Sequence, residues 1–426
     1  MSTMPWRILV VTDLGVDSRV AAPVTTETLA AWFTSLALPV TLEQLAPGSQ
    51  LATGSSATAI DAFLHDSRQQ RIESAWRGLT LLLGHSGGPV SVEVLSLPRK
   101  GLADRFRAAV HGPERIAAEP VTLVVLDFDF THKAEDLATL SALAAMAAEL
   151  QAPIVANAGA GFFELRFLVQ AGAVKDIAGR LADPAHANWQ AFQKSEDARW
   201  LCVTLNRFLL REPWQVEGYR ESCSESNPES YLWGRGVWLV AAAVARSVRA
   251  YGHALDLSGM GGRFDGLATR PFPISANESR ALAAEVSFPE TQSLELTHAA
   301  FTPLNGGLGM ATVMMPMVVT THRHAPGRLT VEGTLAYQLT VARVALACGT
   351  AAGAVEDGAA SDAVAARVTG VLREQLSGLL GDRTEALSVQ VLEADDIAPR
   401  RVAVSVKPPL LLESKAPVFA LEFAIG

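Results

Sequence analysis

The sequence predicts a mixed α/β protein with several lobes, and three observations lead to this prediction. Apolar runs alternate with helical segments between residues 90 and 158, which is the order of parallel strand–helix–strand units. The chain has 426 residues, of which 49% are hydrophobic and 19% charged, so it can bury more than one domain core. Three strand candidates close the chain after a pair of helices.

The first elements follow from apolar spacing. Residues 7–14, RILVVTDL, predict a buried strand. The polar stretch 46–58 predicts a linker, and residues 59–86 carry apolar side chains at helical spacing. A strand at 90–97 and a helix at 102–110 come next.

A strand–helix–strand unit occupies the centre of the chain. The apolar run 121–127 is followed by an Ala- and Leu-rich helix at 138–151 and a short strand at 154–159. A further strand is expected at 200–205 and a long buried helix at 231–252.

The last third begins with a Gly- and Pro-rich region, 253–330, in which we expect short strands such as 293–301 and 311–321. The remaining elements are two helices with apolar stripes and then three strands, at 332–349, 362–381, 386–394, 400–408 and 416–426.

Composition excludes several classes of function. The formal charge of −9 and the absence of clustered Lys and Arg argue against nucleic acid as a partner. Three cysteines lack the spacing of metal ligands, so no metal or cofactor is expected, and they suit a reducing compartment. Without a leader or a span of roughly 20 apolar residues, the sequence predicts a cytoplasmic protein with no membrane insertion.

One motif suggests enzymatic chemistry. Asp127 and Asp129 end an apolar strand and precede Thr131, which matches the DxDxT pattern of magnesium-dependent phosphotransferases and phosphatases. The other groups that such an enzyme needs are not in a suitable order. The favoured interpretation is therefore structural: the two carboxylates end a strand, and Thr131 caps the next helix.

Several segments in order resemble the large subunit of the contractile sheath of bacterial type VI secretion systems, a relative of phage tail sheaths. RIESAWRGLTLLL resembles the family's helix with a central Trp-Arg-Gly, and the segment from Asn188 carries a Trp, then Ser-Glu-Asp-x-Arg, then a strand leading to Arg-Phe-Leu-Leu-Arg. The segments that carry the resemblance are 71–83, 126–137, 151–165, 188–214 and 231–252, and 296–304, 333–347 and the closing strands also fit.

This resemblance implies a structural protomer, not an enzyme, that polymerises around an inner tube and contracts to propel it. Its implied partners are further copies of the chain, an inner-tube protein, a baseplate and, left open, a small sheath subunit. Residues 4–37 look like that small subunit. A recycling AAA+ ATPase grips an amphipathic N-terminal helix in the family, and since none precedes the first strand, recycling of this chain stays open. A non-contracting baseplate or adaptor protein of the same fold is the alternative.

The resemblance divides the chain into a small-subunit-like segment (1–50), an α/β sheath body (51–300) and an inner sheath domain (301–426). In such a polymer, subunits lend strands to their neighbours. We expect three strands near the chain ends to be available for this sheet augmentation, at 7–14, 400–408 and 419–425. The alternative is that these strands pair within the subunit. The helix around 337–347 is the expected contact with the inner tube.

Ten residues are structural or interface candidates. Large aromatic residues are expected in the core, and the charged ones could form an ion-pair network within or between subunits. The candidates are Trp76, Arg77, Gly78, Glu196, Asp197, Arg199, Arg207, Arg211, Trp233 and Gly234.

Overall fold

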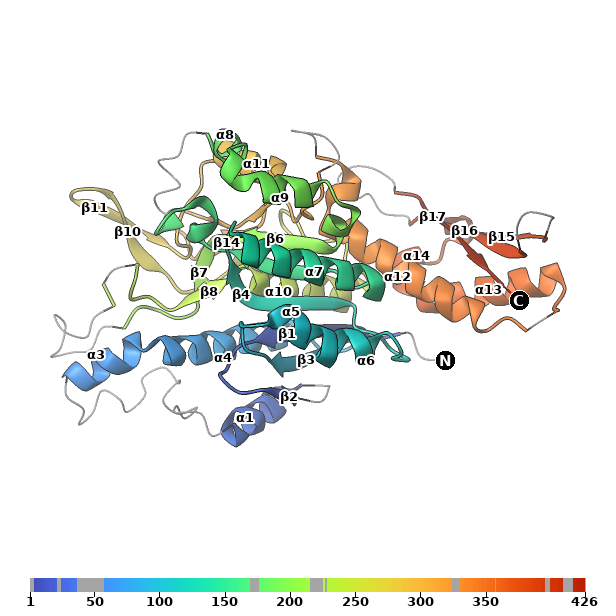
Figure 1. The fold of residues 1–426 in the computed structure, drawn as a ribbon, viewed down its shortest axis with the longest axis horizontal. Coiled ribbons are helices and arrows are strands. Elements are labelled where there is room, and N and C mark those ends of the chain that lie inside the picture. The colour runs from blue at the N-terminus through green and yellow to red at the C-terminus, as the bar shows by residue number, and fades with distance from the viewer. Residues whose placement is uncertain are drawn as a thin grey trace.

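The structure is a computed structural model of the 426-residue chain, drawn in Figure 1. It describes residues 4–20, 24–36, 57–168, 176–214, 225–226, 228–323, 329–356, 358–394, 399–408 and 417–425. The expected linker at 46–58 lies almost wholly outside these residues.

A seven-stranded sheet forms the centre of the body, in the order β12-β6-β5-β4-β1-β3-β2. All neighbouring pairs are parallel except β2 with β3. The strands are β1 (Trp6–Thr12), β2 (Ser18–Val20), β3 (Val90–Ser96), β4 (Leu123–Phe130), β5 (Ile154–Ala158), β6 (Leu201–Leu205) and β12 (Thr302–Pro303). The strand order reverses at β1, which is the topological switch point of a doubly wound α/β sheet.

Both faces of this sheet are covered, which explains why its strands are apolar throughout. In β1, Ile8 and Val10 pack in one core cluster while Leu9 and Val11 pack in another on the opposite face. Helices α4 (Ser67–His85) and α10 (Val237–Tyr251) belong to the first cluster. Helices α5 (Leu102–Phe106) and α7 (Ala134–Leu150) belong to the second.

Smaller elements surround the sheet. Two antiparallel pairs and a three-stranded sheet comprise β7 (Arg207–Leu209) with β8 (Trp233–Arg235), β10 (Arg270–Ser275) with β11 (Glu278–Leu282), and β13 (Asn305–Gly306) with β14 (Thr312–Met314) and β9 (Arg263–Asp265). The further helices of the body are α1 (Thr26–Ser35), α3 (Ala57–His65), α6 (Gly112–Glu114), α8 (Ile177–Leu181), α9 (Ala187–Gln193) and α11 (Glu290–His298).

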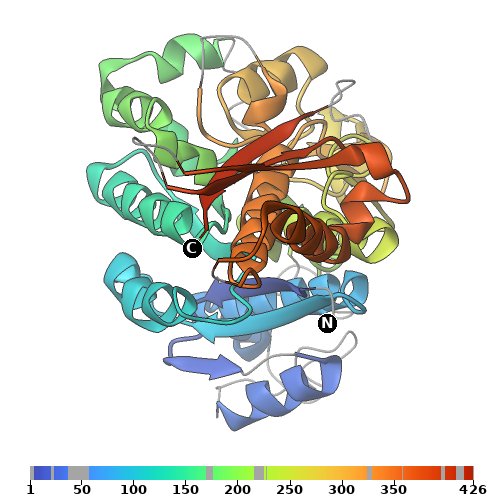
Figure 2. The same ribbon diagram turned by 90° about the vertical axis from the view of Figure 1, so that its right-hand side faces the viewer.

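A second lobe follows at the C-terminus. Helices α13 (Ser361–Gln375) and α14 (Ser377–Leu380) pack with the antiparallel sheet of β15 (Leu387–Leu392), β16 (Arg401–Val406) and β17 (Phe419–Ala424) around a separate core. Helix α12 (Leu335–Ala352) joins the lobes, because Leu335 and Leu339 pack in the body and Val344 packs in the second core. The lobe projects from the body in Figure 1 and faces the viewer in Figure 2.

The expectation that the terminal strands are free for augmentation is wrong for two of the three. β1 is paired on both sides, with β3 and β4, and β16 is paired on both sides, with β15 and β17. The physical reason for β1 is that Ile8 and Val11 are both fully buried, and a strand that is apolar on both faces belongs at the centre of a covered sheet. Among the described strands, β17 pairs only with β16 and so has an open edge.

Two local predictions are also wrong. Residues 293–301 lie mostly in helix α11, which begins after Pro289, and not in a strand. Thr131 does not cap α7, whose N-cap residue is Lys133. Instead, the Thr131 backbone N–H and hydroxyl both donate to Asp136 in the first turn of the helix, at 2.7 and 2.8 Å.

The two expected boundaries do not coincide with separate structural units. β1, from the first segment, lies at the centre of the body sheet, and β12, from the third, pairs with β6. A functional division near residues 50 and 300 therefore stays a prediction.

Helix α12 is long and apolar enough to cross a membrane, judged by length and composition alone, in the part of the chain that the structure describes. About 61% of that segment is buried within the protein, as in the core helix of a soluble protein. Because α12 is mostly covered by the two lobes, little of the stretch 337–347 is free to meet an inner tube.

Candidate functional site

The acidic pair lies at the carboxyl edge of β4, as the sequence predicts, next to the switch point of the sheet. The guanidinium of Arg235, at the end of β8, spans both carboxylates. Its Nη1 is 2.9 Å from Asp127 Oδ1 and its Nη2 is 3.1 Å from Asp129 Oδ2. One cation therefore bridges two strand-end carboxylates.

Neighbouring strands complete this network. Thr12, at the end of β1, donates to Asp127 Oδ2 at 3.0 Å. Asn157 of β5 donates to Asp129 Oδ1 at 2.7 Å, and its own oxygen accepts from Thr204 of β6 at 2.7 Å. The polar groups at the ends of four adjacent strands are thus tied together.

The charges perturb each other's protonation. Burial raises the pKa of Asp129, but the attraction of Arg235 and then Arg207, together with the hydrogen bonds from Arg235 and Asn157, brings it below its ordinary value of 3.8. The pKa of Arg235 is raised: burial lowers it, and the two carboxylates raise it more. The ionised forms are the stable ones at neutral pH.

This arrangement does not suit phosphoryl transfer. Asp127 is only 5% exposed, and both of its oxygens accept hydrogen bonds, so neither is free to attack a phosphorus atom. Arg235 occupies the place beside the carboxylates where such an enzyme holds its magnesium ion. Within the described residues, no cluster of three or more His, Cys, Asp or Glu could hold a metal ion.

A second charged cluster brings together sequence candidates from distant segments. The Arg211 guanidinium contacts Glu73 at 2.9 Å and Glu225 at 2.5 Å, and Arg77 also contacts Glu73, at 2.8 Å. Burial lowers the pKa of Arg211, but the hydrogen bond and charge of Glu225 and the charge of Glu73 raise it above its usual value. Helix α4 is thereby fixed to the segment that follows β7.

Trp233 and Gly234, in β8, adjoin this cluster. The Trp233 carbonyl accepts from Ser74 of α4 at 3.1 Å, and its indole N–H donates to Pro228 O at 2.8 Å. A Cβ on Gly234 would lie 2.8 Å from the Leu210 side chain. Helix α4, which carries the Trp-Arg-Gly motif, thus contacts β8 although Ser74 and Trp233 are 159 residues apart in the chain.

The expected single network of Glu196, Asp197, Arg199, Arg207 and Arg211 is divided. Glu196 pairs with Arg199 at 2.6 Å within the short helical turn Glu196–Trp200. Glu196 also lies 3.7 Å from His322. Arg207 pairs instead with the buried Glu285 at 2.8 Å. The acidic residues near in sequence are therefore not the partners of Arg207 and Arg211.

The aromatic candidates differ in burial. Trp233 is buried, as expected of a core aromatic residue, and so are Trp189 and Trp238. Trp76 is half-buried and meets Phe33 edge-on, with 4.9 Å between the ring centroids. Gly78 faces Trp238, where a Cβ would lie 2.3 Å from the indole ring. Gly78 therefore permits the close packing of α4 and α10.

Sequence reasoning missed the partner residues that hold these clusters, namely Arg235, Glu73, Glu225 and Glu285. One signal was present for Glu73: it lies three positions before Trp76 and so shares a face of α4 with an apolar residue. A carboxylate on a buried helical face requires a cationic partner.

The family to which the sequence matches gives the class of this protein, the tail sheath domains. Residues 56–315, more than half of the chain, match a family model for a tail sheath N-terminal domain. The chain belongs to that family, VipB (EvpB/VC_A0108). This confirms the tail-sheath class that the sequence predicts.

A curated relative points the same way. The chain is similar to the type VI secretion system sheath protein TssC1 of Pseudomonas aeruginosa, with 23% identity over 272 residues. The match covers 58% of this chain and 55% of that protein, so the chain spans about half the length of this relative.

Solved structures with a related chain path include the baseplate of the anti-feeding prophage, determined by cryo-EM, with a TM-score of 0.48 and 11% identity, covering 100% of this chain and 90% of that one. The sheath tail protein of Desulfitobacterium hafniense gives a TM-score of 0.47 and 8% identity, covering 100% and 97%. Similarity at this level carries no argument about function.

Proposed function

We propose that this chain is a structural protomer of a type VI secretion sheath, which polymerises around an inner tube and contracts to propel it. The single observation that carries the proposal is the tail sheath family match over residues 56–315. The similarity to a type VI secretion sheath protein over 272 residues supports the particular system. The proposed site of action is the cytoplasm.

The proposed partners are other copies of the chain, an inner-tube protein, a baseplate and a small sheath subunit. The open edge of β17 supports strand exchange at the C-terminal lobe, because an unpaired edge offers backbone donors and acceptors to another strand. Contacts between unlike surfaces of identical subunits build helical filaments when they do not close.

We propose no enzymatic role. Two observations support this: both Asp127 oxygens accept hydrogen bonds, and Arg235 forms ion pairs with both carboxylates. The check is hydrolysis of a generic phosphate ester with and without magnesium, with Asp127→Asn as the control. Magnesium-dependent turnover that disappears in the variant would establish the phosphatase alternative.

Electron microscopy of negatively stained protein tests the main proposal. We expect cylinders when the purified chain, alone or with the products of neighbouring genes, is concentrated. Discrete particles of fixed size under every condition would instead favour a baseplate or adaptor protein. If a small subunit is required, cylinders should form only when the chain is mixed with the products of the neighbouring genes.

A further inference from the structure

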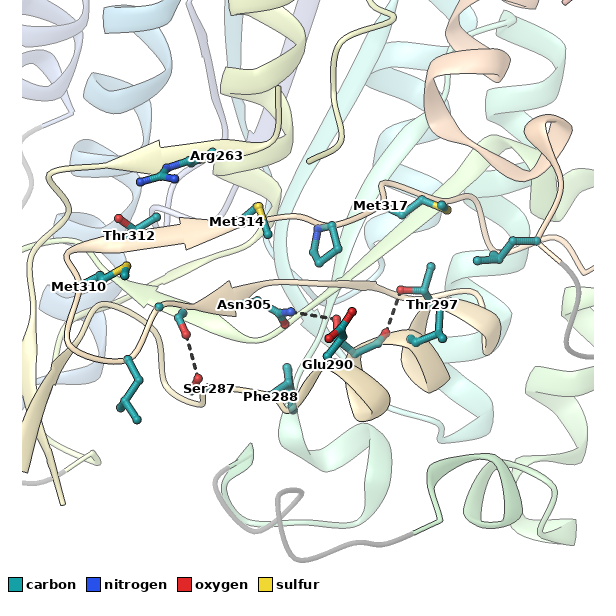
Figure 3. Close-up of a pocket in the computed structure, with 17 residues that line it drawn as sticks. Arg263, Ser287, Phe288, Glu290, Thr297, Asn305, Met310, Thr312, Met314 and Met317 are labelled. Carbon is teal, nitrogen blue, oxygen red and sulfur yellow. Dashed lines mark hydrogen bonds between the residues drawn. The ribbon is translucent and has the colours of Figure 1, made fainter. Parts of the chain in front are cut away.

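An apolar pocket of about 620 Å³ opens on the body, away from the charged clusters. It lies between helix α11 on one side and strands β9 and β14 on the other (Figure 3). Its volume is within the range of sites that enclose a ligand or several side chains. Nothing in the proposed strand exchange uses it.

Large apolar side chains at this pocket are exposed. Leu294, Leu308 and Met310 are 51%, 37% and 57% exposed, and all three line it. Met314 and Met317 also line it. Methionine side chains are flexible and polarisable, and they adapt to an inserted apolar group. The pocket is therefore suited to receive a protein side chain.

The most exposed large apolar residue of the described chain lies elsewhere. Ile116 is 88% exposed, in the turn after α6. This turn is rigidly held, because the buried Glu114 pairs with Arg7 at 2.9 Å and accepts from the Val121 N–H at 2.8 Å. An apolar side chain held out by a rigid turn loses little entropy when it docks, as interface anchors do.

The turn after α6 and the rim of the α11 pocket carry opposite charges. Arg115, next to Ile116, is exposed, and Glu290 is exposed at the rim of the pocket in the first turn of α11. Among the described residues, neither side chain has an ion-pair partner. In Figure 3, the Glu290 side chain lies on α11 among the residues that line the pocket.

We propose that the turn carrying Arg115 and Ile116 docks into the α11 pocket of a second copy of this chain, with Ile116 inside the pocket and Arg115 paired to Glu290. This inference rests on the proposed polymer and names one of its contacts. Figures 1 and 2 both place α6 far from α11, so the turn cannot reach the pocket of the same molecule. Such a contact between unlike surfaces adds copies in one direction, as a helical polymer requires.

Charge reversal tests the pairing. Arg115→Glu and Glu290→Arg should each raise the protein concentration needed for assembly by about tenfold, as expected when a close charge pair becomes repulsive. The double variant should restore assembly. Ile116→Glu should impair it equally, while the matched control Ile274→Glu, at an exposed apolar residue of β10, should not. Unchanged circular dichroism and melting temperature would show that the variants fold.

Disulfide trapping tests the same contact without requiring cylinders. One preparation carries Ile116→Cys and the other Leu308→Cys. Both also carry Cys223→Ser, so that this native thiol cannot compete in the cross-linking. Cys202 and Cys348 can stay, because both are buried. After mixing and mild oxidation, we expect a cross-linked pair that contains one copy of each variant.

The outcomes separate the two proposals. Cross-linking without cylinders would support the contact and remove the sheath function. Cylinders without cross-linking, with no effect of Ile116→Glu, would overturn the contact and leave the sheath function standing. Failure of the double charge reversal to restore assembly would refute the Arg115–Glu290 pairing.

Discussion

At the scale of single residues, Arg235 determines whether the acidic pair can remain in the fold. Arg235→Ala would leave Asp127 buried and without its cation, and removing one partner of a buried pair costs about 3–5 kcal/mol. Urea unfolding measures this. The control is Arg280→Ala, which breaks the half-exposed pair with Glu278 and should cost no more than about 1 kcal/mol. Equal losses would mean that the pair is not structurally important.

The lowered pKa of Asp129 predicts an acid-dependent stability. A carboxyl group whose pKa is lower in the folded state stabilises the protein above its unfolded value of 3.8, and this contribution is lost as the pH falls through the folded pKa. Asp129→Asn should therefore flatten the loss of melting temperature below about pH 4. Asp104→Asn, at an exposed carboxylate outside the site, should leave the acid limb unchanged.

The sequence could place Asp127 and Asp129 at the carboxyl edge of a strand, because an apolar run before them and a helix after them fix that position. It could not supply Arg235, which lies 108 residues later and reaches the pair only when β8 is docked. The same limit applies to Arg211, whose carboxylate Glu73 lies 138 residues away in the chain.

At the scale of elements, the contact of α4 with α10 depends on Gly78. Gly78→Ala would place a methyl group 2.3 Å from the Trp238 ring, and such overpacking costs about 1–3 kcal/mol. Gly84→Ala is the matched control, because it lies in the same helix with nothing within 4 Å. That change should be neutral or stabilise by up to about 1 kcal/mol through helix propensity. Thermal unfolding of both variants checks the difference.

Helix α11 shows why an element's type can escape its sequence. Leu294 and Leu296 are two apart and would share one face of a strand. In the helix, Leu296 is buried and Leu294 is 51% exposed at the pocket. On the buried side, Ser293 accepts a tertiary hydrogen bond from Asn305 at 3.0 Å. The local sequence pattern does not predict such a tertiary hydrogen bond.

At the scale of the whole molecule, the two lobes meet where α12 passes the start of the chain. Arg343, only 8% exposed, donates to the carbonyls of Met4 and Pro5 and lies over the Trp6 ring at 5.3 Å. Burial lowers the pKa of Arg343 to about 10. The guanidinium is thus held by backbone dipoles and an aromatic face.

Arg343→Ala should loosen this junction and cost about 1–3 kcal/mol, because two half-buried carbonyls lose their donor. Arg367→Ala, on the exposed side of α13, should change stability by less than about 0.5 kcal/mol. Hydrogen exchange gives the specific readout: protection should fall in residues 4–6 and 335–347 and persist in β4 and β5. Uniform loss of protection would contradict a local role for Arg343.

By itself, the sequence determined the α/β class, the order of most helices and strands, and membership of the tail sheath class, because apolar period and short motifs are local properties. Only the tertiary structure decided that β1 is a central strand and that Leu294 lines a pocket. It also decided that Arg207 pairs with Glu285, and that Arg211 pairs with Glu73 and Glu225. Strand position, ion pairing and cavities depend on segments far apart in the chain. The free energy of burying apolar surface and of pairing buried charges is set only when those segments pack together and exclude water.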